Sequence, residues 1–179
     1  MQDIHQEIID HHQIRKVLAE YCNACDRCDQ IRMAAVYAED SWDDHGPRGG
    51  KGADFARVIT EEMIHVDSLS HLLGQSTIRV DGDYAGVETY FFAVMRVDAT
   101  EDGPVIHQLG GRFVDELIRD GQEWKISRRV ALRDWSITLL VSQDYVGTQG
   151  LKPGRGSKDP CFAVLGFEHS GIPTFAADR

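Results

Sequence analysis

The nine residues from Tyr21 to Asp29, with the sequence YCNACDRCD, decide how this chain folds. They close a stretch in which apolar side chains recur mostly at three- and four-residue spacings from Ile4 to Cys25, as on one face of a helix. Asp26 therefore follows at the end of an apolar helix face, close in sequence to the phenol of Tyr21. A carboxylate at the edge of a core is costly unless it has a partner or a function. We expect the rest of the chain to supply that partner and a cavity.

The spacing of Tyr21 and Asp26 constrains the end of this helix. On an unbroken helix, side chains at that spacing point about 140° away from each other. We therefore expect the helix, predicted over residues 4–25, to end or loosen near Cys25, so that both side chains can reach one pocket. Asp29 has another role: it precedes a short helical stretch at 30–37 and is suited to be its N-cap.

Composition limits the classes of function. A chain of 179 residues is long enough for one domain with a full core, and 42% hydrophobic with 27% charged residues is ordinary for a soluble protein. A net charge of −10 without a lysine or arginine cluster argues against nucleic acid or an anionic membrane as a partner. No apolar run approaches the length of a membrane span, and the first residues lack a positive region followed by an apolar one, so we expect neither a membrane span nor a secretory signal. We expect a cytoplasmic protein.

Three of the four cysteines, Cys22, Cys25 and Cys28, make two overlapping C-x-x-C spacings. A zinc site would need a second ligand pair, and no later C-x-x-C exists. A redox motif would open a helix after a strand, whereas this run closes a helix. We therefore expect buried thiols and no metal.

The segment 39–52 crowds four carboxylates and a histidine among four glycines and a proline. Oxygen and imidazole ligands suit several cations, but no recognised ligand spacing is present. A solvated, turn-rich loop after one short strand is the expected structure. Trp42 and His45 are candidate pocket-lining residues within it.

After a third helix at 53–66, the apolar period changes from about 3.6 to 2, which indicates strands. Asp120-Gly121 has the composition of a two-residue hairpin turn. We expect antiparallel strands at 68–74, 84–97, 105–119 and 122–136.

The last forty or so residues differ in composition, with a Gly-, Lys- and Pro-rich stretch before a short apolar run. We divide the chain into a domain of residues 1–136 and a C-terminal arm or lid of residues 137–179. The arm either packs on its own domain or lies over a neighbouring subunit.

Three helices followed by a strongly curved, mainly antiparallel sheet make an α+β cone. In this order of elements, in residues 21–29 and 36–46, and in the run from Gly111 through Trp124 to Trp135, the chain resembles the nuclear-transport-factor-2-like (NTF2-like) superfamily in its SnoaL-like branch. The resemblance covers about residues 5–136. It implies a cone-shaped α+β barrel that encloses a pocket. The superfamily includes binding and assembly domains as well as enzymes, so the fold alone does not define the function.

The enzymes that this sequence resembles are lyases: scytalone dehydratase, hexachlorocyclohexane dehydrochlorinase, bile-acid 7α-dehydratase and the diarylpropane lyases. They use an Asp–His pair inside the cone, sometimes with a tyrosine. The resemblance implies that Asp26 is that aspartate, His71 its histidine and Tyr21 the tyrosine. His107 corresponds to a second pocket histidine in scytalone dehydratase.

The resemblance also implies an arginine on the last strand that faces the pocket. Arg129 and Arg133 both fit, and the sequence does not choose between them. The expected substrate-binding residues are therefore Arg129, Arg133, Trp42, His45, Phe92 and Phe113.

From these residues we predict a cofactor-independent lyase of aromatic compound catabolism. It would remove water, formaldehyde or another small group from a hydroxylated, largely apolar, aromatic or polycyclic molecule. Asp26 would orient the imidazole of His71, His71 would take the proton from carbon, and Tyr21 and His107 would assist the departing oxygen. No nucleotide-binding motif is present, so no cofactor is expected.

Besides a small subunit that only supports a larger oxygenase, two alternatives remain open at this point. One is a non-catalytic module that holds a ligand in the cone or docks a partner protein. The other is an isomerase similar to ketosteroid isomerase, because proton abstraction beside a carbonyl needs the same base. Apolar residues on the outer face of the sheet also favour a homo-oligomer, a trimer rather than a dimer.

Overall fold

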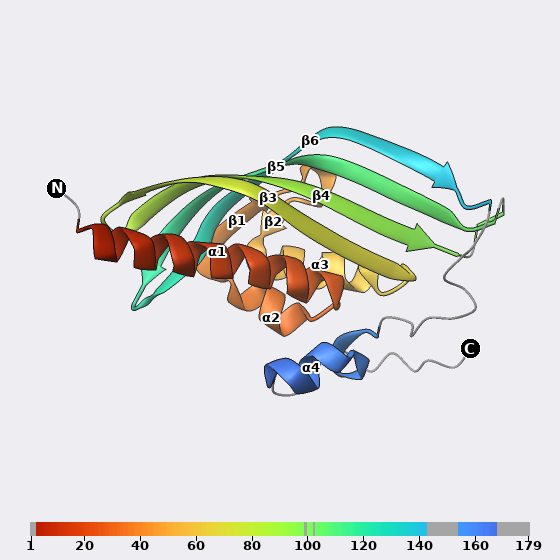
Figure 1. Ribbon diagram of the computed structural model, residues 1–179, viewed down its shortest axis with the longest axis horizontal. Coiled ribbons are helices and arrows are strands. Elements are labelled where there is room, and N and C mark those ends of the chain that lie inside the picture. Colours follow the sequence, from red (N-terminus) through yellow and green to blue (C-terminus); the bar gives the residue numbers. More distant parts are fainter. Residues whose placement is uncertain (1–2, 99, 102, 143–153, 168–179) are drawn as a thin grey trace.

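The computed structural model describes residues 3–98, 100–101, 103–142 and 154–167, which form one curved sheet with α1, α2 and α3 on its inner side (Figure 1). The six strands lie in the order β2-β1-β6-β5-β4-β3. Neighbouring strands are antiparallel except β1 and β6, which are parallel. The sheet is open, with β2 and β3 at its edges. The predicted α+β cone is thereby confirmed.

The first helix, α1, runs unbroken through Asp26, because the amide of Arg27 still bonds to the carbonyl of Asn23 at 3.1 Å. The predicted end of the helix near Cys25 is thus confirmed to within one residue, but Asp26 is still helical, so Tyr21 and Asp26 point in different directions. Asp29 caps the second helix as predicted. No helix in the described ranges is both long and apolar enough to cross a membrane. The helices span Ile4–Asp26 (α1), Gln30–Ala35 (α2), Gly52–Met63 (α3) and Pro160–Leu165 (α4), with single 3₁₀ turns at Gly46–Arg48 (η1) and Gly156–Lys158 (η2).

Four long antiparallel strands make up most of the sheet, and two of the tight turns between them contain glycines in the left-handed region, Gly82 and Gly121. Asp120 pairs with Glu123, so the last hairpin turn is Gly121-Gln122, one residue later than predicted. Two strands are longer than predicted, because their ends continue to pair with β4 and β5. The strands span Tyr37–Asp44 (β1), Gly50–Lys51 (β2), Ser68–Asp81 (β3), Tyr84–Val97 (β4), Val105–Asp120 (β5) and Glu123–Leu140 (β6).

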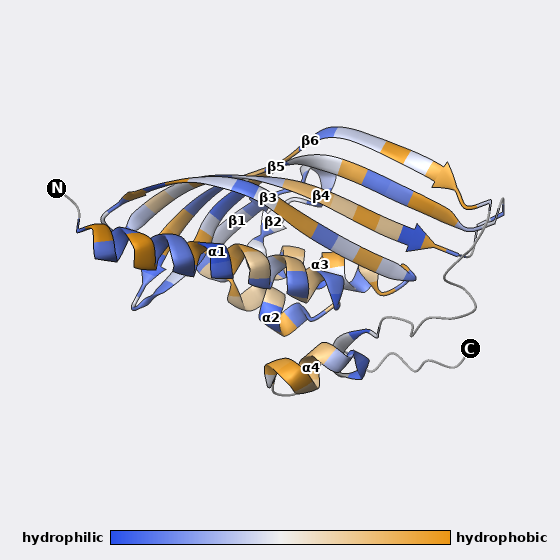
Figure 2. Cartoon of the chain, viewed as in Figure 1, coloured by the Kyte–Doolittle hydropathy of each residue, from blue (hydrophilic) through white to orange (hydrophobic). Residues whose placement is uncertain are grey.

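Hydrophobic and hydrophilic residues alternate along the long strands, so that one face of the sheet can pack on a core (Figure 2). That core lies between the sheet and α1–α3. Its largest fully buried apolar side chains are Ile14, Leu18, Met33, Phe55, Phe113, Leu117, Trp124 and Ile126.

Large apolar side chains are exposed along the distal part of β6, at Trp135, Ile137, Leu139 and Leu140. Exposed apolar surface is typical of self-association. The homo-oligomer stays a prediction.

The described part of the C-terminal segment, residues 154–167, packs on its own chain near the α1–α2 connection. Arg27 pairs with Asp159 at 3.3 Å. The guanidinium of Arg32 lies 3.4 Å from the ring centroid of Phe167. Residues 143–153 and 168–179 lie outside the described residues, so an arm over a neighbouring subunit stays a prediction. Strand β6 crosses the expected domain boundary at residue 136 and ends at Leu140.

Asp10 fastens the first half of α1 to the β5–β6 hairpin. Its buried Oδ1 accepts hydrogen bonds from Arg119 at 2.8 Å, Gln6 at 3.0 Å and Trp124 at 3.2 Å. Burial by itself would raise the pKa of this carboxyl. The three donors outweigh burial and hold the pKa of Asp10 below its ordinary value.

We expect Asp10→Asn to lower the free energy of unfolding by about 1–3 kcal/mol at pH 7, because hydrogen bonds to a charged acceptor are lost. A carboxyl with a lowered folded-state pKa stabilises the fold above its unfolded pKa, and this stabilisation is lost as the pH falls through the folded pKa. The difference in stability between the two proteins should therefore begin to shrink below about pH 4 and vanish below the lowered folded-state pKa of Asp10. Urea unfolding at several pH values measures this.

Asp83→Asn is the matched control, because Asp83 pairs with the same Arg119 but is exposed. Its effect should stay within about 0.5 kcal/mol. An Asp10→Asn effect that is the same at pH 7 and pH 3 would contradict the assignment.

Candidate functional site

Asp26 and His71 meet where the end of α1 packs on the edge strand β3. Oδ2 of Asp26 accepts a hydrogen bond from the backbone amide of His71 at 2.9 Å. Oδ1 lies 2.6 Å from the ring Nδ1 of the same residue. The two side chains are 12% and 13% exposed, respectively. The structure thus brings together two residues that are far apart in sequence.

The carboxylate of Asp26 determines which nitrogen of His71 is available for chemistry. A carboxylate can only accept, so we assign Nδ1 as the protonated nitrogen of the neutral ring. Nε2 is then the lone-pair nitrogen, and the negative charge of Asp26 stabilises the imidazolium that forms when Nε2 takes a proton. The arrangement is suited to general-base chemistry.

Arg155 links the two elements that carry this pair. Its Nη1 donates to the carbonyl oxygen of Asp26 at 2.5 Å, and its Nη2 donates to the carbonyl oxygen of Val66 at 2.5 Å. Val66 lies just before β3, the strand of His71. One guanidinium from the C-terminal segment therefore holds the end of α1 and the approach to β3 at a fixed separation.

His71 lines a cavity of about 540 Å³ between the sheet and helices α1 and α3. That volume is suited to a small organic ligand, and most of the wall is apolar, as in typical ligand sites. The side chains with polar or ionisable groups in the wall are Tyr21, Cys25, His45, Arg48, His71 and Arg133.

Two phenyl rings, Phe91 and Phe113, lie side by side in the wall. Phe91 and Phe113 stack with their centroids 4.3 Å apart and their planes 15° apart. Tyr21 contacts Phe113 edge-on at 5.6 Å, and His71 lies 6.5 Å from Phe91. Such a surface is suited to an aromatic or polycyclic ring.

Arg129 supports this wall from behind. It is fully buried and binds both oxygens of Asp115, at 2.7 Å and 2.8 Å. Its guanidinium lies 4.0 Å from the ring centroid of Tyr21 and 4.1 Å from that of Phe113. The substrate-binding role predicted for Arg129 is therefore wrong, because the residue does not line the cavity.

Tyr21 lines the cavity, and its phenol is a hydrogen-bond donor at neutral pH. Burial raises the pKa of Tyr21 well above its ordinary value, and the charge of Arg129 lowers it only in part. Tyr21 and Asp26 are not side by side in the wall, because the intact helix directs Asp26 to β3 while Tyr21 faces the cavity.

Arg133 is the strand arginine that reaches the cavity. A bulge between Gly110 and Gly111 leaves Asp134 without a partner residue in the β5–β6 ladder. Bulges re-aim the side chains beside them, and here Leu132 and Arg133 both line the cavity although they are neighbours. Arg133 is exposed and has no ion-pair partner among the described residues.

Besides Arg129, three further residues predicted for the pocket lie outside its wall. Trp42 is 52% exposed on the short strand β1. Phe92 packs on Trp135 at 5.8 Å, because it alternates with Phe91 and faces the other side of the sheet. His107 lies near the start of β5, where its ring bonds to the hydroxyl of Thr138 at 2.8 Å. Its catalytic role has no support from this position.

Asp43 is a site residue that the sequence analysis missed. The predicted solvated loop is in fact strand β1 up to Asp44, in which the side chains of Tyr37, Ser41 and Asp43 are buried. Asp43 is 0% exposed and accepts hydrogen bonds from the hydroxyl of Tyr37 and from Nδ1 of His45. The even spacing of these buried residues, four and then two positions apart, was the signal, but the crowded carboxylates concealed it.

The cysteines of the opening stretch are free and buried. Burial raises the pKa of the Cys22 thiol to about 12 and that of Cys25 well above its ordinary value. Protonated thiols of this kind are poor nucleophiles. Among the described residues, no group of three or more His, Cys, Asp or Glu side chains is placed to hold a metal ion.

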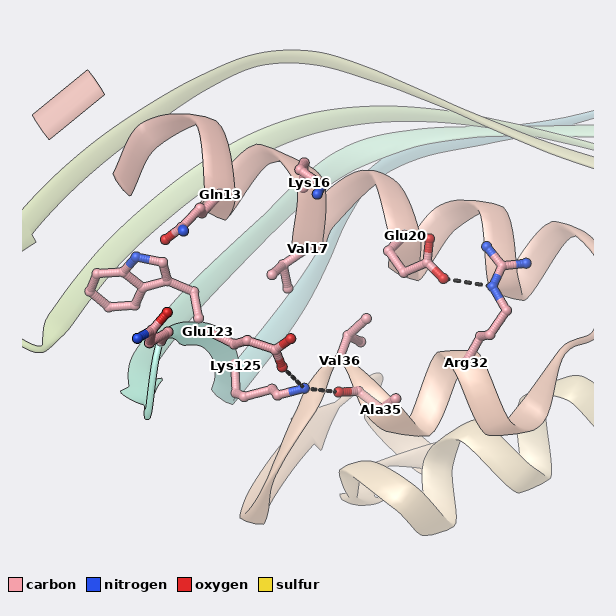
Figure 3. A pocket seen from close by; sticks show the side chains of 11 residues that line it. Gln13, Lys16, Val17, Glu20, Arg32, Ala35, Val36, Glu123 and Lys125 are labelled. Carbon is pink, nitrogen blue, oxygen red and sulfur yellow. Dashed lines mark hydrogen bonds and ion pairs between the residues drawn. The ribbon is translucent and has the colours of Figure 1, made fainter. Parts of the chain in front are cut away.

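A second hollow, of about 440 Å³, opens between α1, α2 and the end of the β5–β6 hairpin (Figure 3). Four of its five charged side chains pair with each other: Arg32 with Glu20 at 2.6 Å, and Lys125 with Glu123 at 3.1 Å. No histidine lines it. The cavity at His71 is therefore the stronger candidate for a functional site.

The curved sheet over three helices, with a ligand-sized hollow between them, places the protein among the NTF2-like α+β cones. A family model described as the SnoaL-like domain matches residues 6–130, and the chain belongs to that family. The resemblance drawn from the sequence is thereby confirmed.

The relatives share this fold at low sequence identity. The uncharacterized protein Rv2910c of Mycobacterium tuberculosis is 28% identical over 127 residues, 69% of this chain and 85% of its own. A protein provisionally assigned as a scytalone dehydratase of Novosphingobium aromaticivorans superposes with a TM-score of 0.68 at 19% identity, over 83% of this chain and all of its own. A hexachlorocyclohexane dehydrochlorinase, LinA type 2, gives 0.71 at 12% identity, over 82% and 100%. At these identities the solved structures establish the fold alone.

We expect the neutral His71 ring to carry its proton on Nδ1, and Asp26→Asn to shift the tautomer toward Nε2–H, because an asparagine oxygen cannot replace both carboxylate acceptors. Two-bond ¹H–¹⁵N correlation spectra of the imidazoles measure this. Because asparagine can accept only one of these two hydrogen bonds, Asp26→Asn should also lower the free energy of unfolding by about 1–3 kcal/mol.

The His107 ring is the internal control, because it bonds to Thr138 and its tautomer should not respond to Asp26→Asn. An Nε2–H tautomer of His71 in the wild-type protein would contradict the assignment.

Proposed function

We propose that the protein is a cofactor-independent lyase that uses Asp26 and His71 to eliminate a small group from a hydroxylated, largely apolar ring compound. The observation that carries the proposal is the double hydrogen bond from His71 to the buried carboxylate of Asp26, with the ring at the wall of a cavity of about 540 Å³. A histidine oriented by a carboxylate is a general base that works near neutral pH.

The reaction needs a proton to leave carbon and a group to leave the neighbouring carbon. Nε2 of His71 accepts the proton, and the electrons of the C–H bond form the new double bond. Tyr21 donates a hydrogen bond to a substrate oxygen, and its raised pKa keeps that donor protonated. These residues supply the general base and the hydrogen-bond donor, so the proposed reaction needs no cofactor.

The lining of the cavity suggests the class of substrate. The stacked rings of Phe91 and Phe113 favour a flat ring system. Arg133, without an ion-pair partner among the described residues, is free to bind a carbonyl, phenolate or carboxylate oxygen of the substrate. Scytalone and hexachlorocyclohexane, for which two structural neighbours are named, are rational first compounds to test.

We expect Asp26→Asn and His71→Gln to lower turnover by about 100- to 10,000-fold, because each removes the oriented base. Chromatography of reactions with scytalone, hexachlorocyclohexane and a hydroxylated diarylpropane measures this. His107→Gln is the matched control and should keep wild-type turnover, because His107 does not line the cavity.

Normal turnover in both site variants would refute the assignment of the base. A wild-type protein that binds these compounds and converts none of them would favour the binding module.

We expect Arg133→Met to raise KM by about tenfold with a smaller change in kcat, because loss of equal binding to the substrate and the transition state affects KM alone. Steady-state kinetics on the converted compound measure this. Arg128→Met is the control on the same strand, because Arg128 is exposed and does not line the cavity. A fall in kcat at unchanged KM would instead mean that Arg133 acts on the transition state.

A further inference from the structure

The cavity wall contains a second Asp–His pair, separate from Asp26–His71. His45 lines the cavity, and its Nδ1 is hydrogen-bonded to Oδ1 of Asp43. The other oxygen of Asp43 accepts the hydroxyl proton of Tyr37. The chain Tyr37–Asp43–His45 therefore repeats the arrangement of an imidazole oriented by a buried carboxylate that a third group holds in place.

The geometry of this unit leaves one nitrogen of His45 for the cavity. Asp43 is 0% exposed and, as a carboxylate, can only accept, so Nδ1 of His45 is the donor. Nε2 has no hydrogen-bond partner among the described residues, and the ring is 22% exposed at the cavity wall.

The surroundings fix the ring and the carboxylate in place. The His45 ring stacks on Phe55 of α3 with centroids 4.5 Å apart and planes 18° apart. Gly52, at the start of α3, lies so close to the Tyr37 ring that an added Cβ would come within 2.4 Å of it. Groups held by packing and by a second layer of hydrogen bonds can act without reorganisation. A solvated surface pair would show none of these constraints.

The two histidines flank the same pair of phenyl rings. His71 lies 6.5 Å from Phe91, His45 lies 6.1 Å from Phe113, and the two phenyl rings stack between them. A ring compound lying over Phe91 and Phe113 would therefore have one imidazole near each end. An elimination needs two proton-transfer groups at two different atoms of the substrate.

We propose that Tyr37, Asp43 and His45 form a second acid–base unit, in which His45 gives a proton to the leaving oxygen while His71 removes the proton from carbon. This rests on the lyase function proposed above. Tyr21 is the weaker candidate for the acid, because burial raises the pKa of its phenol well above the ordinary value and so opposes full proton transfer.

The step balances as the loss of water. Nε2 of His71 takes the proton from a carbon beside a substrate carbonyl, and the C–H electron pair is held as an enolate until it becomes the second bond between the two carbons. The C–O bond breaks with its electron pair on oxygen, and that oxygen takes the proton from Nε2 of protonated His45 and leaves as water. His71 is then protonated and His45 neutral, and proton exchange with solvent restores both.

The second unit also defines the class of leaving group. A departing hydroxyl needs a proton, whereas chloride leaves as a stable anion without one. The paired histidines therefore favour hydroxylated substrates over halogenated ones.

A first experiment tests the position of His45 without turnover. With ¹⁵N-labelled imidazoles, titration with 1-naphthol, an apolar bicyclic ring with one hydroxyl, should shift the Nε2 signals of both His45 and His71. The signal of exposed His65 is the control and should not move. A shift of His71 alone would overturn the proposal.

A second experiment separates the two proton transfers with scytalone in D₂O. We expect His45→Gln to slow dehydration by about 100-fold or more while hydrogen–deuterium exchange at the substrate carbon continues, because His71 is intact. His71→Gln should abolish both. Asp43→Asn, which leaves His45 in place, should lower kcat with little change in KM, and Tyr37→Phe should have a smaller effect of the same kind.

The possible failures are distinguishable. If His45→Gln dehydrates at the wild-type rate, the second unit is refuted and the lyase assignment stands. If it loses exchange and dehydration together, His45 is not a separate acid, and the proposal fails in this form. If the wild-type protein neither exchanges nor dehydrates any compound of the panel, the lyase assignment fails, and this proposal with it.

Discussion

The carboxylate of Asp26 is the constraint on which the site depends. β3 is an edge strand, so amides on its outer side have no partner strand. Asp26 accepts one of these amides and the ring of the same residue, His71. A shift of β3 by one residue would break both bonds and turn His71 to the other face. The end of α1 therefore fixes the register of the strand as well as the orientation of the histidine.

Much of this arrangement could be predicted from the sequence, because it follows from periodicity. The change from helical to alternating apolar spacing located the long strands, and the isolated acid at the end of an apolar helix face indicated that Asp26 needs a partner. The choice between Arg129 and Arg133 could not be made, because both lie on the inner face. The bulge opposite Gly110 and Gly111 and the burial of Asp115 determine which arginine reaches the cavity. Neither feature produces a recognisable pattern in the sequence.

Asp43 escaped prediction for a different reason. Charge-rich, glycine-rich segments are usually solvated, and that average expectation is wrong for a strand whose alternate residues face a core. The parallel pairing of β1 with β6 places Asp43 beside Arg129, a contact between segments far apart in the chain. Local sequence statistics carry no information about such pairing. His107 shows the converse, since a suitable residue type in a suitable strand still does not line the cavity.

The Arg155 bridge means that this pocket is completed late in biosynthesis. The two carbonyls that it binds belong to residues made early, at positions 26 and 66. As the ribosome releases the chain from its N-terminus, the helix and the edge strand can meet well before their tie emerges. A nascent chain that lacks Arg155 would contain Asp26 and His71 but not the hydrogen bonds that join the end of α1 to the approach of β3. Full alignment of these groups would then wait until residue 155 has left the ribosome.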